Sequence, residues 1–94
     1  MLIFNVLNET NPPLSEIYVR HMTVDEALPL VHKQLYDAFM AGACEVRVVH
    51  GKGTGKLREL IRKEMDSHPL VESYREGGKG EGGDGVTIVE LSER

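Results

Sequence analysis

"HGKGTGKLREL", residues 50–60, carries the strongest fold signal in this chain. The apolar residues Val46, Val48 and Val49 run into it and predict an inner strand covered on both faces or mostly so. Leu57, Leu60, Ile61 and Met65 follow at helical spacing and predict an amphipathic helix. The stretch is therefore a glycine-rich turn between a strand and a helix, with Thr54 as the expected helix cap.

A turn of this kind is well suited to binding anions. The first amide groups of a helix lack backbone partners and lie at the positive end of the helix dipole. Five of the eleven Lys and Arg residues fall in the same window, namely Lys52, Lys56, Arg58, Arg62 and Lys63. We expect any anion-binding face to centre here, and a solvated helix surface balanced by acidic neighbours is the alternative.

Two familiar nucleotide-binding motifs do not fit the glycine spacing. A Walker loop needs four residues between its glycines and a hydroxyl after the lysine, whereas three residues separate Gly51 from Gly55 and Leu57 follows Lys56. The dinucleotide motif G-x-G-x-x-G is also absent, because Gly51, Gly53 and Gly55 alternate. The spacing therefore excludes these ATPase and dehydrogenase motifs.

The segment before the stretch predicts a strand and a long helix. Residues 16–22 are β-branched and aromatic enough for a short strand. Thr23 and Glu26 then form the pattern of a reciprocal capping box at a helix start. Pro29 is expected to kink this helix without dividing it, and Gly42 is expected to end it.

The segment after the stretch predicts two more strands. Residues 70–76 alternate, and residues 86–91 are apolar. Between them, residues 77–85 hold six glycines in nine positions, which predicts a flexible connection in an antiparallel hairpin. The order is β-α-β-α-β-β, and its two strand–helix–strand units predict parallel pairings. We expect an α/β two-layer sandwich with a mixed four-stranded sheet and two helices.

Composition limits the other possibilities. A chain of 94 residues forms one domain, here residues 17–94, preceded by an extension or linker at residues 1–16 that is rich in apolar residues and prolines. The single cysteine, Cys44, is expected to be a buried small hydrophobe in a reducing compartment. Without a signal-peptide pattern or a membrane-length apolar run, we expect a cytoplasmic protein. The net charge of −4 argues against general binding to nucleic acid.

Two motifs together resemble the small MutS-related (Smr) domain family. They are "HGKGTGKL", residues 50–57, and "GGDGVTIVEL", residues 82–91, and "MTVDEA", residues 22–27, also fits. The resemblance covers residues 17–91. It implies a sandwich similar to the C-terminal domain of translation initiation factor three, found in stand-alone proteins and at the C-terminus of MutS2 proteins. It further implies binding of DNA or RNA, a link to DNA repair or recombination and, in several members, nicking endonuclease activity.

The chain departs from this family in the first strand. Where the family carries L-D-L-H-G, this chain reads Ile17, Tyr18, Val19, Arg20 and His21. The family's acidic residue and histidine are proposed contributors to cleavage, and Tyr18 and Arg20 stand in their places. Tyr18 cannot act as a carboxylate, whereas Arg20 can bind a phosphate. Because His21 is shifted by one strand position, we expect its side chain to face away from the site.

The resemblance and the charge pattern together predict a phosphate-backbone site. We expect it to comprise His50, Gly51, Lys52, Gly53, Thr54, Gly55, Lys56, Arg58, Arg20 and Lys79. His50 is also the candidate catalytic residue, as a general acid or base, and its alternative role is to stabilise the turn. No pair of histidines has zinc-ligand spacing with Cys44, so we expect no structural metal. A divalent Mg or Mn ion is expected only if the domain cleaves. A homodimer or a MutS-like or ribosomal partner is the remaining alternative.

Overall fold

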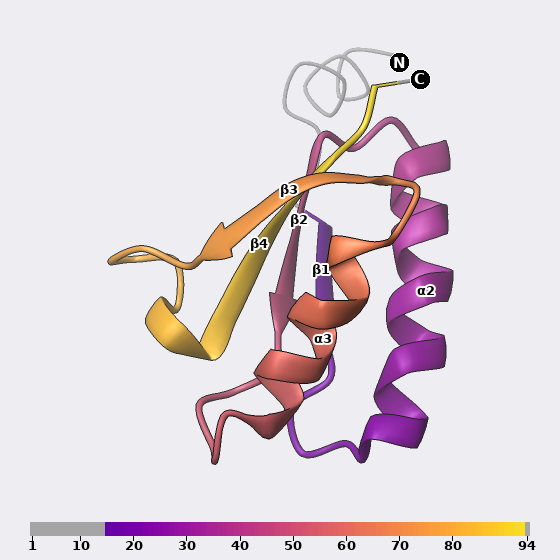
Figure 1. Ribbon diagram of the computed structural model, residues 1–94. Coiled ribbons are helices and arrows are strands. Elements are labelled where there is room, and N and C mark those ends of the chain that lie inside the picture. The colour runs from indigo at the N-terminus through magenta and orange to yellow at the C-terminus, as the bar shows by residue number, and fades with distance from the viewer. Residues whose placement is uncertain (1–14, 94) are drawn as a thin grey trace, which may run out of the picture.

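The computed structural model describes residues 15–93. Four strands and two helices follow one another in the predicted order (Figure 1). They are β1 (Ser15–Tyr18), α2 (Val24–Met40), β2 (Glu45–Val49), α3 (Lys56–Asp66), β3 (Val71–Glu76) and β4 (Val86–Leu91), with a short 3-10 turn, η1 (Gly83–Gly85), before β4. Residues 1–14 of the predicted extension lie outside the described residues, and its last two residues belong to β1.

The sheet has the order β1-β2-β4-β3. β1 and β2 are parallel, and β4 is antiparallel to both β2 and β3. The predicted mixed sheet and the antiparallel β3–β4 hairpin are confirmed. The second predicted parallel pairing is wrong, because β4 lies between β2 and β3. β4 takes this inner place since five of its six residues are buried, more than in any other strand.

Both helices pack on one face of the sheet, which confirms the two-layer sandwich. The core of this face contains Val46 and Val48 of β2, Val89 and Leu91 of β4, and residues of both helices. On the other face of β2, Glu45, Arg47 and Val49 are only half-buried. The prediction of an inner strand is confirmed, because β2 lies between β1 and β4. Its second face is only partly covered, since no third layer follows the sheet in the described chain.

Two arginines shield the open face of the sheet. Ile88 lies opposite Arg47 on one side and Arg75 on the other, and only 2% of its surface is exposed. Arg47 approaches Glu16 at 4.0 Å, and Arg75 reaches over β4 to Glu45 at 3.9 Å. The aliphatic stems of the arginines can cover the isoleucine.

The ends of α2 follow the sequence signals. The Thr23 hydroxyl accepts from the Glu26 amide at 3.2 Å, and the Glu26 carboxylate accepts from the Thr23 amide at 3.0 Å, which confirms the capping box. Pro29 lies within the helix and does not divide it. At the other end, Gly42 has a φ of +87° and donates to the Phe39 carbonyl, which confirms it as the residue that ends the helix.

Two histidines link α2 to α3: His32 lies in the middle of α2, and His68 follows the end of α3. His32 contacts the Glu64 carboxylate at 3.0 Å and stacks on His68 with 5.0 Å between ring centroids. His68 accepts a hydrogen bond from the Leu70 amide, and burial lowers its pKa. This cluster ties the C-terminal half of α3 to α2, and the glycine-rich stretch precedes the other end of α3.

Two expectations about the remaining loops are corrected. Cys44 is exposed, because it lies in the connection before β2 and not in the strand. The loop at residues 77–85 is folded on itself: Arg75 donates to both carboxylate oxygens of Glu81, and the same carboxylate accepts from the Gly78 amide at 2.7 Å. These bonds hold the pKa of Glu81 at about 2.

Neither described helix is long and apolar enough to cross a membrane.

Candidate nucleic-acid interface

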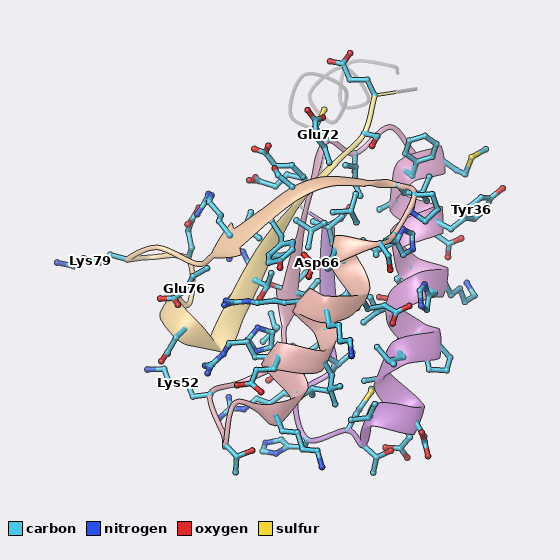
Figure 2. The ribbon with its side chains drawn as sticks, viewed as in Figure 1. Tyr36, Lys52, Asp66, Glu72, Glu76 and Lys79 are labelled. Carbon is cyan, nitrogen blue, oxygen red and sulfur yellow. The ribbon has the colours of Figure 1, made fainter. Side chains whose placement is uncertain are left out.

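A cleft of about 850 Å³ opens between the turn after β1 and the glycine turn before α3. Both connections lie at the lower edge of the sheet in Figure 1, because the parallel strands β1 and β2 end at the same edge. The cleft is lined by nine of the ten predicted site residues, namely Arg20, His50, Gly51, Lys52, Gly53, Thr54, Gly55, Lys56 and Arg58. Lys79 is exposed on the 77–85 loop and points away from the rest of the domain (Figure 2).

Gly51 brings the two turns into contact. Its φ is +81°, and an added Cβ would lie 3.1 Å from Cγ of Arg20. The absence of a side chain lets Arg20 lie along the glycine turn, although the two residues are 31 positions apart in the sequence. The guanidinium of Arg20 therefore belongs to the same surface as the amide groups of the turn.

The start of α3 is open to a ligand. Gly55 is the N-cap with a φ of +86° and no side-chain cap, so the prediction that Thr54 occupies the cap position is wrong. Thr54 instead accepts a weak bond from the Lys56 amide at 3.3 Å. The amides of Leu57 and Arg58 have no acceptor among residues 15–93. These groups and the helix dipole are available to an anion.

His50 is a buried residue that joins the turn to β4. Only 4% of its surface is exposed. Its Nδ1 lies 2.9 Å from the Gly51 carbonyl oxygen, and its Nε2 lies 2.8 Å from Oγ1 of Thr87. The amides of His50 and Gly51 both donate to the Gly85 carbonyl, at 3.1 and 2.9 Å. These contacts fit the turn-stabilising role that the sequence left open.

The partners fix the proton positions in this network. A carbonyl oxygen only accepts, so His50 donates to Gly51 from Nδ1 and presents a bare Nε2 when neutral. The Thr87 hydroxyl then donates to this Nε2 and accepts from Nε of Arg62 at 3.1 Å. A chain of hydrogen bonds therefore runs from Arg62 through Thr87 to His50 and ends at the backbone of the glycine turn.

The environment keeps His50 neutral. Burial is the main cause that lowers its pKa below the ordinary 6.5. The hydrogen bond to the Gly51 carbonyl opposes this, Arg62 and Arg58 add repulsion that lowers the pKa further, and Asp84 raises it slightly. At neutral pH the imidazole is therefore an uncharged part of the turn, with both nitrogens occupied.

The cleft has a strongly asymmetric charge. Arg20, Lys52, Lys56 and Arg58 line it, and no Asp or Glu does so in the described chain. Two carboxylates contact lining residues from outside the cleft: Asp84 approaches Lys52 at 3.5 Å, and Glu26 accepts from the Thr23 amide at 3.0 Å. The backbone carbonyl of Asp84 also faces Arg58 at 3.5 Å. An anion entering the cleft thus meets four cations, although the whole chain has a net charge of −4.

Sequence reasoning missed two parts of this site. Thr87 lies within the motif "GGDGVTIVEL", and the signal for its role is a hydroxyl within an apolar strand. His21 lines the cleft and does not face away from it. Side chains alternate between faces only within a strand, and β1 ends at Tyr18, so the one-position shift does not decide where His21 faces in the following turn. Tyr18 itself is 55% exposed and is not part of the cleft lining.

The described side chains offer no ready metal site. Within residues 15–93 no group of three or more His, Cys, Asp or Glu residues is placed to hold an ion. The cleft lining also lacks the carboxylate oxygens that Mg²⁺ prefers. The residues present do not fit a protein-held divalent cation, so no reaction step is derived through one.

Comparisons with known proteins show the family of this chain. The Smr domain family model matches residues 17–92. Endonuclease MutS2 of Symbiobacterium thermophilum is 51% identical over 78 residues, which are 83% of this chain and 10% of that protein. Endonuclease MutS2 of Caldicellulosiruptor saccharolyticus is 52% identical over 85 residues, 90% of this chain and 11% of that protein. The chain thus spans about a tenth of the length of these relatives.

Two solved structures share the fold. The crystal structure of the Smr domain of Thermus thermophilus MutS2 matches with a TM-score of 0.81 and 43% identity, covering 84% of this chain and 99% of that one. YdaL, a stand-alone small MutS-related protein from Escherichia coli, matches with a TM-score of 0.79 and 22% identity, covering 96% and 76% of the two chains. The second match shows the fold alone.

Proposed function

Because this chain belongs to the Smr domain family, we propose that its cleft binds the phosphate backbone of a nucleic acid, with DNA as the first substrate to test. One observation carries the proposal. Four cations and the unpaired amides of α3 converge on a cleft with no carboxylate among its described lining residues. Such a surface matches a chain of phosphates, and cations together with helix N-termini are common phosphate contacts.

Binding of this kind reads little sequence and depends strongly on salt. Each neutralised phosphate releases counterions, so about four contacts give a slope near −3.6 in a plot of log affinity against log salt. The described cleft contains no Phe, Tyr or Trp that would form a broad stacking platform. We therefore expect similar affinity for different sequences of the same shape.

A pair of matched variants tests the proposal. The Lys52→Glu/Lys56→Glu variant removes two cations from the cleft, and Lys33→Glu/Lys63→Glu makes the same substitutions on exposed helix surfaces. Both variants have the same composition and net charge. In gel shifts at low salt, the first should lose at least about tenfold in affinity and about two units of salt slope, and the second should bind nearly as the wild type. Equal affinity of the two variants would refute a cleft-centred site.

Arg58 is left unchanged in this test for a structural reason. It folds back across the helix start, where its Nη2 would lie 2.6 Å from a Cβ on Gly55. Its substitution would alter the turn as well as the charge. The side chain of Lys52, by contrast, is 73% exposed, and its ion pair with Asp84 contributes little stability at such exposure. Thermal melts of Lys52→Glu/Lys56→Glu should therefore stay close to that of the wild type. The control should melt slightly lower, because Lys33→Glu replaces the ion pair of Lys33 with Asp37 by a like-charge pair.

Nicking endonuclease activity is a second candidate, supported by the name of the MutS2 relatives. The test is conversion of supercoiled plasmid to nicked circles, with Mg²⁺, with Mn²⁺ and with a chelator. Lys52→Glu/Lys56→Glu, purified in parallel, is a better control than a His50 variant, because His50 supports the turn itself. Nicking by wild type alone supports this candidate, and equal nicking by both proteins contradicts it.

A role in DNA repair or recombination and a homodimer or MutS-like partner stay predictions.

A further inference from the structure

The turn after β1 holds a non-glycine residue in a left-handed conformation. The Met22 amide donates to the Val19 carbonyl at 3.0 Å and closes a four-residue turn. His21, the third residue of this turn, has a φ of +71°, and it is the sole non-glycine with a positive φ among residues 15–93. A positive φ at this position, following a residue with a negative φ, is the pattern of a type II turn, which favours glycine.

The chain uses glycine at every other such position that the structure describes. Positive φ values occur at Gly42, Gly51, Gly53, Gly55, Gly80, Gly82 and Gly83. A side chain in this region strains the backbone, because its Cβ crowds the neighbouring carbonyl. His21 is therefore a costly choice at a position where glycine would be relaxed.

No contact within the fold accounts for the histidine. His21 is exposed, and its imidazole makes no hydrogen bond, ion pair or ring contact with residues 15–93. Strained residues of this kind persist at functional sites, where the side chain acts on something outside the fold. His21 is one of the residues that line the cleft, on the turn that faces the glycine turn.

The cleft lining is partly apolar as well as cationic. Beside the cations, its lining includes the apolar side chains of Met22, Val49, Leu57 and Val86. Its volume of about 850 Å³ lies within the range of small-molecule sites. A phosphate alone has no use for apolar surface, whereas a nucleotide carries a flat ring beside its phosphate. Histidine is one of the side chains on which unstacked bases are held.

We propose that His21 contacts the base of an unpaired nucleotide whose phosphate lies on the glycine turn. The inference rests on the proposed function and narrows its substrate class to DNA with single-stranded or extruded nucleotides. In an intact duplex the bases are stacked inside and cannot reach the imidazole without unstacking. A strand with an unpaired base fills both the cationic and the apolar part of the cleft.

Two variants of the full chain separate base contact from backbone structure. His21→Gly removes the strain at the positive φ, which stabilises the folded state, but it also makes the unfolded chain more flexible, which opposes this gain. The net rise in melting temperature should be about 2–5 °C. His21→Asn removes the imidazole ring but tolerates the left-handed conformation, so its melting temperature should stay near that of the wild type. Both should lose affinity for the unpaired nucleotide.

Binding is measured by fluorescence anisotropy on one short DNA duplex, with and without a single unpaired thymidine. The wild type should prefer the bulged duplex, and both variants should lose about fivefold to tenfold in affinity for it, as expected for one lost base stack. Their affinity for the intact duplex should change less than twofold. The proposal is overturned if the variants bind the bulged duplex as tightly as the wild type does, or if they lose equal affinity for both duplexes. Either result leaves backbone binding intact. If the wild type binds neither duplex, the proposed function itself fails.

Discussion

Replacing Thr87 with valine is the sharpest test of the network that supports the glycine turn. Valine has nearly the same shape as threonine, so the fully buried site, with 0% of its surface exposed, stays filled. What disappears is the hydroxyl, which lies 2.8 Å from Nε2 of His50 and 3.1 Å from Nε of Arg62. Any loss of stability can therefore be assigned to polar contacts and not to a cavity.

The size of the loss follows from the two bonds. Leaving a buried imidazole nitrogen without a donor costs about 1 kcal/mol, and removing an acceptor from a charged guanidinium costs about 1.5–3 kcal/mol. The larger cost falls on Arg62. Its Nη2 is already buried without a partner in residues 15–93, so losing the Thr87 hydroxyl would leave its Nε without an acceptor as well. We expect the free energy of unfolding to fall by about 2–4 kcal/mol, a large part of the total for a domain of this size.

Urea unfolding followed by circular dichroism measures this difference, with Thr87→Ser as the matched control. Serine keeps the hydroxyl and loses one buried methyl group, which costs about 1 kcal/mol. Thr87→Val should therefore be less stable than Thr87→Ser, although valine fills the site better. An unchanged slope in urea would show that both variants unfold as the wild type does. If Thr87→Val proves as stable as Thr87→Ser, the hydroxyl does not hold the turn.

Two further predictions concern the same turn. Since burial lowers the pKa of His50 below 6.5, its contribution to stability is complete above that pH and declines as the pH falls below it, because the unfolded state takes up the proton first. Urea midpoints between pH 7.5 and 5.5 should therefore decrease, and a ring that NMR shows protonated at pH 7 would contradict this. Gly55→Ala should lower the free energy of unfolding by about 1–2 kcal/mol because of its positive φ and its contact with Arg58, whereas Gly53→Ala, with a φ of +41° and open space, should cost less in the same urea assay.

Local signals in the sequence predicted most of the fold. The Thr23 capping box and Gly42 mark the ends of α2, because each acts through hydrogen bonds to residues only a few positions away. Strand order could not be predicted in this way. The sequential arrangement β1-β2-β3-β4 and the observed arrangement share every local turn, and they differ only in whether β2 pairs with β3 or β4. The observed order is favoured because it buries β4 against β2, far away in the sequence, and no short sequence motif predicts that contact.

The site shows the same division. The glycine spacing placed residues 50–58 together, and Arg20 joins them because β1 and β2 are parallel and end at one edge. The burial of His50 depends on Thr87, which comes from a strand far along the chain and is aligned by the Val48–Thr87 register. His21 was misplaced because alternation along a strand was extended past Tyr18, where the strand ends. The family's motif has glycine at this position, and the φ of +71° supplies a physical reason.

The position of His50 changes how mutations in the motif must be interpreted. A His50→Ala variant would leave the Gly51 carbonyl and the Thr87 hydroxyl without their partner, and it would open a cavity under the turn. Loss of DNA binding or nicking in that variant would follow even if the imidazole never touched a phosphate. Thr87 has no place in the cleft lining and reaches the turn only through His50. If Thr87→Val weakens binding in proportion to its loss of stability and Thr87→Ser does not, the motif histidine acts by holding the glycine amides in place.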